Sequence, residues 1–281
     1  MAASQPHELQ NLGYTVTMRM LQEWAMLAET RHFIFQLGFQ KCGSSLVSSL
    51  IDAHPNACMA LNRTFMTDAD PLSREQYFAL LLEDSRVAAR EGRGHDSYSY
   101  RLPGAGPEGK TNLIALGAKG AWDNAQLMIR DRNLFKRFEE KVQLPFKYIF
   151  CVRNPYDMIS GVWNWKEHRR VNAPIDDVID RFLPIAVEND RMLKEVCGPQ
   201  DALLIRLEDL ISTPDIWLQA TERHLGLPND VKWLADCTKL LFKKHQTIGR
   251  TRAPWTRGAV ERVQKDLIEE FPRFFFGYKY E

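Results

Sequence analysis

The chain lacks the features that would place it in or outside a membrane. Its 281 residues contain no apolar run of spanning length and no stretch that resembles a signal peptide. The five cysteines are an odd number without paired spacing, which indicates free thiols in a reducing compartment rather than a disulfide framework. For the chain as it stands, these absences predict a cytoplasmic protein without a membrane partner.

An excess of charge of one sign is also absent. The chain has 37 basic and 36 acidic residues, so no bulk attraction to nucleic acid is expected, and any anion must be bound by locally placed groups. The seven histidines show no His-x-x-x-His or paired Cys/His spacing, and no metal site is predicted. Neither a repeat nor a linker is visible, which predicts one domain over residues 31–281 after a helical extension over residues 1–30.

The most informative segment, Phe33–Pro55, has the pattern of a buried strand, a glycine-bounded loop and a helix. Gly38 and Gly43 have the spacing of the phosphate-binding loop G-x-x-x-x-G-K-[ST], but a serine follows Gly43 and the lysine lies inside the loop, as Lys41. Free N–H groups at the helix start and the helix dipole would still favour a phosphate. A lysine on the loop side suits a donor activated at its first phosphate. The alternative is a plain tight turn.

A second strand–turn–helix pattern covers Lys147–Trp165, and its strand ends at Arg153. Ligands of open α/β sheets bind outside the carboxyl ends of the strands. Arg153 is therefore expected on the same rim as Lys41, which favours a dianionic ligand. Alternatively, Arg153 pairs only with Asp157 at the start of the helix.

Together and in this order, the two motifs resemble those of the sulfotransferases that use 3′-phosphoadenosine 5′-phosphosulfate (PAPS). Residues 40–45, QKCGSS, match the loop P/Q-K-x-G-T/S-T/S of that family, and residues 153–157 match R-N-P-x-D in full. Residues 203–210 and 224–228 resemble its later R-Y-E-D-L and F-L-G-L segments, and residues 249–255 its basic C-terminal loop. The resemblance implies a single α/β domain with a central parallel sheet flanked by helices, the P-loop-NTPase-like sulfotransferase fold.

The resemblance also implies roles for individual residues. Lys41 would contact the 5′-phosphate and the oxygen that bridges to sulfur, where a fixed ammonium stabilises the charge of the leaving phosphate. Lys119 would steady the transferred group, and Arg153 would hold the 3′-phosphate. The implied donor is PAPS, the product is 3′,5′-ADP, and no metal is needed. The implied donor-binding residues are Gln40, Lys41, Cys42, Gly43, Ser44, Ser45, Leu46, Arg153, Ser160, Arg250 and Arg252.

Some positions depart from the family. Gly161 stands where the family has serine or threonine, and Ser160 is one position earlier, which turns a helical side chain by about 100°. Leu46 and Leu207 replace two aromatic residues, so adenine stacking is lost there or supplied from elsewhere.

The usual general base is missing. Ala121 stands where the family has a histidine, and no glutamate follows the second strand. The remaining candidates for the base could also be solvated surface residues. They are His95, Asp96, Asp123, Asp68 and Asp70.

The rest of the chain predicts alternating elements. Beyond the strands of the two motifs, strands are expected at 57–61, 112–116 and 202–207, and helices at 74–90 and 121–141, which implies a parallel sheet. Residues 92–110 hold five glycines and two prolines, and we predict that this loop closes as a lid over the acceptor. The alternative is a plain connector.

The predicted function is transfer of a sulfuryl group from PAPS to a hydroxyl or amine of a small-molecule acceptor, by in-line displacement without metal. Without an extended basic stripe, a polyanionic glycan is a poorer acceptor candidate. Two alternatives stay open. One is an idle nucleotide-binding module of the same fold, suggested by the missing base and Gly161. The other is a degenerate P-loop kinase, which the chain disfavours because it lacks G-K-[ST].

Overall fold

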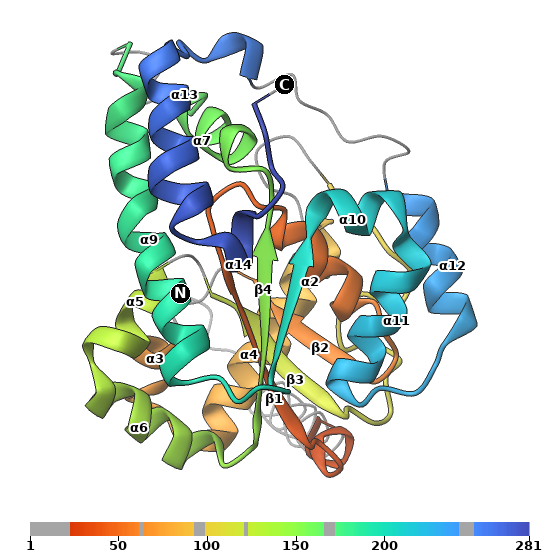
Figure 1. The fold of residues 1–281 in the computed structure, drawn as a ribbon. Helices are drawn as coiled ribbons and strands as arrows, with labels where there is room; N and C mark the ends of the chain where they lie inside the picture. Colours follow the sequence, from red (N-terminus) through yellow and green to blue (C-terminus); the bar gives the residue numbers. More distant parts are fainter. Residues whose placement is uncertain are drawn as a thin grey trace, which may run out of the picture.

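A five-stranded, all-parallel sheet forms the centre of the computed structural model, which describes residues 23–61, 65–92, 99–120, 123–165, 172–241 and 250–280. The strand order is β2-β3-β1-β4-β5 (Figure 1). The strands are β1 (His32–Gly38), β2 (Ala57–Ala60), β3 (Ala115–Lys119), β4 (Phe146–Val152) and β5 (Ala202–Arg206). This arrangement confirms the predicted α/β class and parallel sheet.

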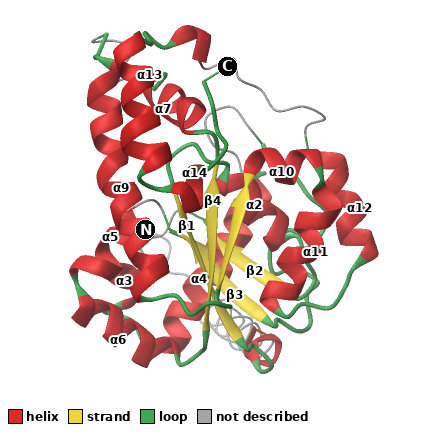
Figure 2. Cartoon of the chain, viewed as in Figure 1, coloured by secondary structure: helices red, strands yellow, loops and turns green. Residues whose placement is uncertain are grey.

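Helices cover both sides of the sheet. In Figures 1 and 2, α5, α6 and α9 lie to the left of the strands, and α10, α11 and α12 lie to the right. The helical elements are α2 (Ser44–Asp52), α3 (Phe65–Ala69), α4 (Arg74–Glu91), α5 (Asp123–Arg130), α6 (Arg132–Val142), α7 (Pro155–Trp163), α9 (Ile175–Glu195), α10 (Leu207–Ser212), α11 (Pro214–Leu225), α12 (Val231–Leu240), the 3₁₀ turn η1 (Arg250–Arg252), α13 (Arg257–Val263), the π-helical turn η2 (Gln264–Glu269) and α14 (Pro272–Phe275). Among the described residues, no helix is long and apolar enough to cross a bilayer.

Strand β1 lies at the middle of the core. Phe33, Ile34 and Phe35 are fully buried, as a strand covered on both faces requires. The ring of Phe35 packs edge-on against Phe146 of β4, with centroids 4.9 Å apart, and the ring of Phe138 on α6 lies 5.5 Å from Phe35. These contacts fix the central strands that carry the loop and rim residues described below.

Most predicted elements are present, with shifted bounds. Strand β3 begins at Ala115 rather than at residue 112, because the N–H of Leu113 bonds instead to the carbonyl of Met26. Lys119 is consequently the last residue of β3 and does not follow it. The helix predicted over 121–141 is interrupted at Asp131, whose side chain accepts from the N–H of Leu134, 2.9 Å away, and so starts α6.

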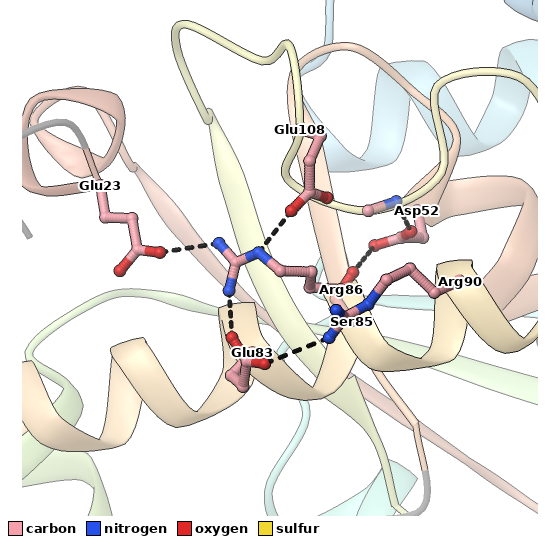
Figure 3. A network of polar contacts seen from close by, with 8 residues as sticks. Glu23, Asp52, Glu83, Ser85, Arg86, Arg90 and Glu108 are labelled. Carbon is pink, nitrogen blue, oxygen red and sulfur yellow. Dashed lines mark hydrogen bonds and ion pairs between the residues drawn. The ribbon is translucent and has the colours of Figure 1, made fainter. Parts of the chain in front are cut away.

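The glycine-rich loop is tied to the far end of α2. Asp52, the fully buried last residue of α2, accepts from the N–H of Gly106 at 2.5 Å and from the hydroxyl of Ser85 at 2.7 Å. The ammonium of Lys110 donates to the carbonyl oxygens of Asp52 and Ala57. Figure 3 shows this anchor beside a second cluster, in which Arg86 contacts three carboxylates, those of Glu23, Glu83 and Glu108.

These contacts place the glycine-rich loop away from the loop between β1 and α2. Helix α2 starts at Ser44 and ends at Asp52, so its two ends lie about 12 Å apart at 1.5 Å per residue. The lid prediction is therefore wrong for residues 99–110, because a segment anchored at the end of α2 lies at the opposite edge of the sheet from the start of that helix. Two base candidates of this loop, His95 and Asp96, lie outside the described residues.

Candidate functional site

Two glycines shape the loop between β1 and α2. Gly38 has φ 131°, and a Cβ atom there would lie 2.3 Å from the carbonyl oxygen of Cys151 on β4. Gly43 has φ 89°, and a Cβ atom there would lie 2.9 Å from the Leu207 side chain. Both the left-handed backbone and the close approach therefore exclude a larger residue at either position.

Buried amide side chains hold this loop from behind. The Gln36 amide donates to the carbonyl oxygen of Ser44 at 2.8 Å, and the Asn189 amide, from α9, donates to the carbonyl oxygen of Gly38 at 2.9 Å. The first N–H groups of a helix have no intrahelical partner. With the loop fixed in this way, the N–H groups at the start of α2 are pre-organised for an anion.

Lys119 points at the start of α2 from β3. Its ammonium donates to the Ser45 hydroxyl at 2.9 Å, although the residue is only 5% exposed. Burial lowers the pKa of Lys119, and the nearby charge of Lys41 lowers it further. A buried ammonium that costs stability in this way is a feature of functional sites.

Lys41 lies along α7. It has a left-handed backbone, with φ 59°, and its stem packs on Gly161, where a Cβ atom would lie 3.0 Å from Lys41 Cγ. Its ammonium is 5.1 Å from the centroid of the Trp165 ring, within the range of a cation–π contact. The two predicted catalytic lysines therefore meet at one loop: Lys41 belongs to it, and Lys119 reaches it from the end of β3.

The side chains of Cys42 and Leu46 point into the core. Cys42 is 1% exposed and contacts the Cys151 thiol, whose pKa burial raises well above its ordinary value. Leu46 is buried, as is Leu207, which packs against Gly43. A ligand could therefore contact Cys42 only through its backbone, and Leu46 or Leu207 through the backbone or an aliphatic surface.

Arg153 follows β4 directly and lies beside a buried carboxylate. Its Nε is 3.7 Å from Asp157, whereas the Nε of Arg250, from η1, is 2.6 Å from the same carboxylate. Asp157 and Arg250 are both largely buried, at 3% and 7% exposed. The pairing of Arg153 with Asp157 is thus the looser of the two, and Asp157 brings two guanidinium groups together on one rim.

The other predicted donor ligands differ in access. Ser160 is fully buried, and its hydroxyl donates to the carbonyl of Tyr156 at 2.7 Å and accepts from the Trp255 indole at 2.9 Å. A phosphate would have to displace these bonds to reach it. Arg252 is exposed, and Gln40 is half-buried in the turn before Lys41.

Comparison with known proteins gives the fold. No family model and no curated protein sequence matches the chain. Its structure is similar to that of the sulfotransferase STF9 from Mycobacterium avium, with a TM-score of 0.55 and 11% identity over 95% of this chain and 82% of that one. It is also similar to the sulfotransferase domain of the Synechococcus PCC 7002 olefin synthase, with a TM-score of 0.52 and 17% identity over 90% and 97%. The chain has the sulfotransferase fold.

Within this fold, the described candidates for the general base are few. Asp70 is exposed and forms a two-bonded pair with Arg137, at 3.0 and 3.1 Å. This hydrogen bonding lowers the pKa of Asp70, which makes it a poor base. Asp68 is half-buried on α3. Asp123 begins α5, but its side chain lies outside the described part of the structure.

Sequence reasoning missed two parts of the rim. Glu208 accepts from the N–H of Asn154 at 2.9 Å and from the Tyr278 hydroxyl at 2.7 Å, and it belongs to the LEDL segment that resembled the fold family. Residues 276–280 lie across the same rim. Their signal in the sequence was the dense aromatic run of residues 271–280. Among the described residues, no group of three or more His, Cys, Asp or Glu side chains is placed to hold a metal ion.

Proposed function

We propose that the chain is a PAPS-dependent sulfotransferase that transfers the sulfuryl group to a hydroxyl or amine of a small molecule. One observation carries the proposal: basic residues meet at one edge of three adjacent strands. Lys119 ends β3, Lys41 follows β1 and Arg153 follows β4, and these strands are neighbours in the order β3-β1-β4. Such an edge fits a ligand with phosphates at two separate positions.

The 5′ side of the donor would lie on the loop. The N–H groups at the start of α2, with the hydroxyls of Ser44 and Ser45, would hold its 5′-phosphate. Lys41 would stabilise the charge that this phosphate gains as its bond to sulfur breaks. Lys119, held on Ser45 at 2.9 Å, would steady the sulfuryl group during transfer.

The 3′-phosphate would lie on the opposite part of the rim. Arg153 and Arg250 are the proposed ligands there, because Asp157 holds both guanidinium groups from behind. Arg252 and Gln40 are further proposed contacts. Ser160 is a weaker ligand in this geometry because its hydroxyl is engaged by Tyr156 and Trp255, and its proposed contribution is to support α7.

The acceptor would transfer its proton to a carboxylate, and we propose Asp123 for this role because it begins α5 just after the end of β3. General-base help of this kind contributes about 10²- to 10⁴-fold in rate.

We further propose that residues 31–281 form one cytoplasmic domain and that residues 1–30 are an extension.

A nucleotide-binding panel tests the donor. We expect 3′,5′-ADP to raise the melting temperature without magnesium, and to do so more than ADP or ATP, because only 3′,5′-ADP carries both phosphates of the site. A preference for ATP with magnesium would instead indicate the kinase alternative. Mass spectrometry of a metabolite panel incubated with PAPS then identifies the acceptor.

The Lys41→Ala variant separates catalysis from binding. We expect it to fold normally and to lose turnover by about 10²-fold or more, since loss of one transition-state donor costs about that much. Lys136→Ala, which removes an exposed lysine on α6, is the matched control and should keep its activity. Near-normal kcat in Lys41→Ala would overturn the mechanism. If the unchanged chain binds 3′,5′-ADP but transfers no sulfuryl group to any acceptor, the idle nucleotide-binding module is favoured.

A further inference from the structure

Residues 276–280, which we call the tail segment, contact both the end of β5 and the turn that follows β4. Arg206, at the end of β5, donates to the carbonyl oxygen of Phe276, and its guanidinium lies 4.3 Å from the centroid of the Tyr278 ring. The Asn154 amide donates to the carbonyl oxygen of Lys279 at 3.1 Å. The tail segment is therefore tied both to the residue after Arg153 and to the end of the neighbouring strand.

Glu208 joins these contacts into one unit. Its carboxylate accepts from the N–H of Asn154 at 2.9 Å and from the hydroxyl of Tyr278 at 2.7 Å. Burial and the charge of Glu208 raise the pKa of Tyr278, so the hydroxyl stays protonated and donates. Bonds from one partly buried carboxylate to two segments fix those segments relative to each other.

Tyr280 completes an aromatic cluster over Arg250. Its ring centroid lies 5.0 Å from Tyr156 and 5.6 Å from Trp255, both with steep interplanar angles. The guanidinium of Arg250 is 6.0 Å from the Tyr280 ring and 5.9 Å from the Tyr156 ring, at the outer range of cation–π contact. Because Tyr280 is 41% exposed while Arg250 is 7% exposed, Tyr280 is the outer layer and Arg250 the inner one.

We propose that the tail segment forms the outer wall of the 3′-phosphate site and that Tyr280 is a positioning residue for Arg250. This inference rests on the proposed function and deepens it, because it assigns recognition of the 3′-phosphate to a part of the chain outside the known motifs. Asp157 holds the guanidinium of Arg250 from within, at 2.6 Å, and Tyr280 confines it from outside. A guanidinium held on two sides loses less conformational entropy when it binds a phosphate than a mobile one does.

The ligand chemistry follows from this placement. The wall contacts Arg250 and the residue after Arg153, and these two arginines are the ones proposed for the 3′-phosphate, so it is expected to act on a phosphate at that position rather than on the 5′ group. The affinity for a nucleotide without a 3′-phosphate, such as 5′-AMP, should not depend on Tyr280.

Calorimetric affinities for 3′,5′-ADP and 5′-AMP test the proposal on the full chain. We expect Tyr280→Leu to weaken 3′,5′-ADP about 5-fold, the size of a partly shielded cation–π contact, and to leave 5′-AMP within about 2-fold. Tyr280→Phe keeps the ring and should behave like the unchanged chain. Trp24→Leu is the matched control, since Trp24 is an aromatic residue of similar exposure, 46%, at the opposite edge of the sheet. Equal losses for both nucleotides would overturn the proposal in favour of direct contact with the adenine, and no loss would overturn it outright.

A second measurement needs no nucleotide. In urea unfolding, Tyr280→Leu and Arg250→Met should be non-additive, because each removes the same contact, whereas Trp24→Leu and Arg250→Met should add. Additive effects of the first pair would contradict the positioning of Arg250 by Tyr280. If the unchanged chain does not prefer 3′,5′-ADP to 5′-AMP, the proposed donor and the ligand of this wall both fail, while a non-additive cycle would still support the contact between the two residues.

Discussion

Gly161 lies directly beneath the stem of Lys41. A Cβ atom built on Gly161 would be 3.0 Å from Lys41 Cγ and 3.1 Å from Lys41 Cβ, closer than non-bonded carbon atoms normally approach. The residue that departs from the family pattern is thus the one that gives the lysine of the loop its path along α7 toward Trp165.

Gly161→Ser should lower turnover even though it restores the family's residue type. The new side chain displaces Lys41, and a displacement of that kind costs about 10- to 100-fold in kcat when it moves a catalytic group by about 1 Å. Affinity for 3′,5′-ADP should change less, since Arg153 and Arg250 are untouched. The measurement is kcat at saturating PAPS together with a calorimetric titration.

Gly258→Ala is the control for this substitution. Gly258 lies in α13, and a Cβ atom there would meet nothing within 4 Å, so the change should be neutral or slightly stabilising. A Gly161→Ser protein with unchanged kcat would show that the path of Lys41 along α7 does not matter for transfer.

Lys119→Met should stabilise the protein while it lowers activity. The ammonium is 5% exposed and its pKa is lowered chiefly by burial, so a neutral side chain of similar length removes a desolvation cost. We expect a higher melting temperature and a clear loss of kcat, the exchange of stability for function typical of active sites. A destabilised Lys119→Met would show that the ammonium contributes structural bonds that outweigh its burial.

The stability advantage of Lys119→Met over the unchanged chain should shrink as the pH rises. The native pKa of Lys119 lies below its ordinary value of 10.5, so the native state releases this proton first as the pH rises. The penalty is complete below the native pKa and disappears as the pH approaches 10.5. Melting curves of both proteins between pH 7 and 10 should therefore converge.

The fold and the geometry of the glycine-bounded loop could be predicted from local pattern. A buried strand, a glycine pair and a helix start specify their own geometry, because Gly38 and Gly43 can adopt conformations that other residues avoid. The rim at Arg153 was predictable for the same reason, since the carboxyl ends of parallel strands share one edge.

Contacts between distant segments could not be predicted in this way. No local rule indicates that Tyr280 covers Arg250 or that Asp52 holds Gly106, because each pair depends on how elements far apart in the sequence pack. Composition alone predicted a lid for the glycine-rich loop, whereas the bond from Gly106 to the Asp52 carboxylate and the bonds from the Lys110 ammonium to two carbonyl oxygens anchor it. The start of β3 was misplaced because Leu113 is as apolar as a strand residue but bonds to Met26 instead.

Asp52→Asn should destabilise the fold without a direct effect on the site. The carboxylate accepts from the N–H of Met59, the hydroxyl of Ser85 and the N–H of Gly106, at 2.7, 2.7 and 2.5 Å. An amide must turn its NH₂ group toward one of these donors, which costs about 2–3 kcal/mol for a buried, charge-assisted bond. Urea unfolding gives the value. Asp70→Asn, at an exposed carboxylate, is the control and should have a much smaller effect, and equal effects would contradict the role of Asp52 as the anchor.

His224→Gln should make the protein less sensitive to mild acid. Burial, followed by the charge of Lys147, lowers the pKa of His224 to about 4 from its ordinary value of 6.5, and its Nε2 lies 3.2 Å from the carbonyl oxygen of Tyr148. The unfolded chain binds this proton first as the pH falls. The contribution of neutral His224 to the free energy of unfolding is therefore fully present above pH 6.5 and is lost between pH 6.5 and about 4.

The size of this effect is limited by solvent. A shift of this size corresponds to at most about 3 kcal/mol, and screening at a half-buried ring reduces it to roughly 1–2 kcal/mol. Urea midpoints at pH 7 and 4.5 measure it, with glutamine keeping a donor for the Tyr148 carbonyl. Carboxylates and the other histidines lower the stability of both proteins alike, so only the difference between the two losses reports His224. We expect the unchanged chain to lose more than His224→Gln, and identical losses would show that His224 takes up its proton equally well in the folded and the unfolded state.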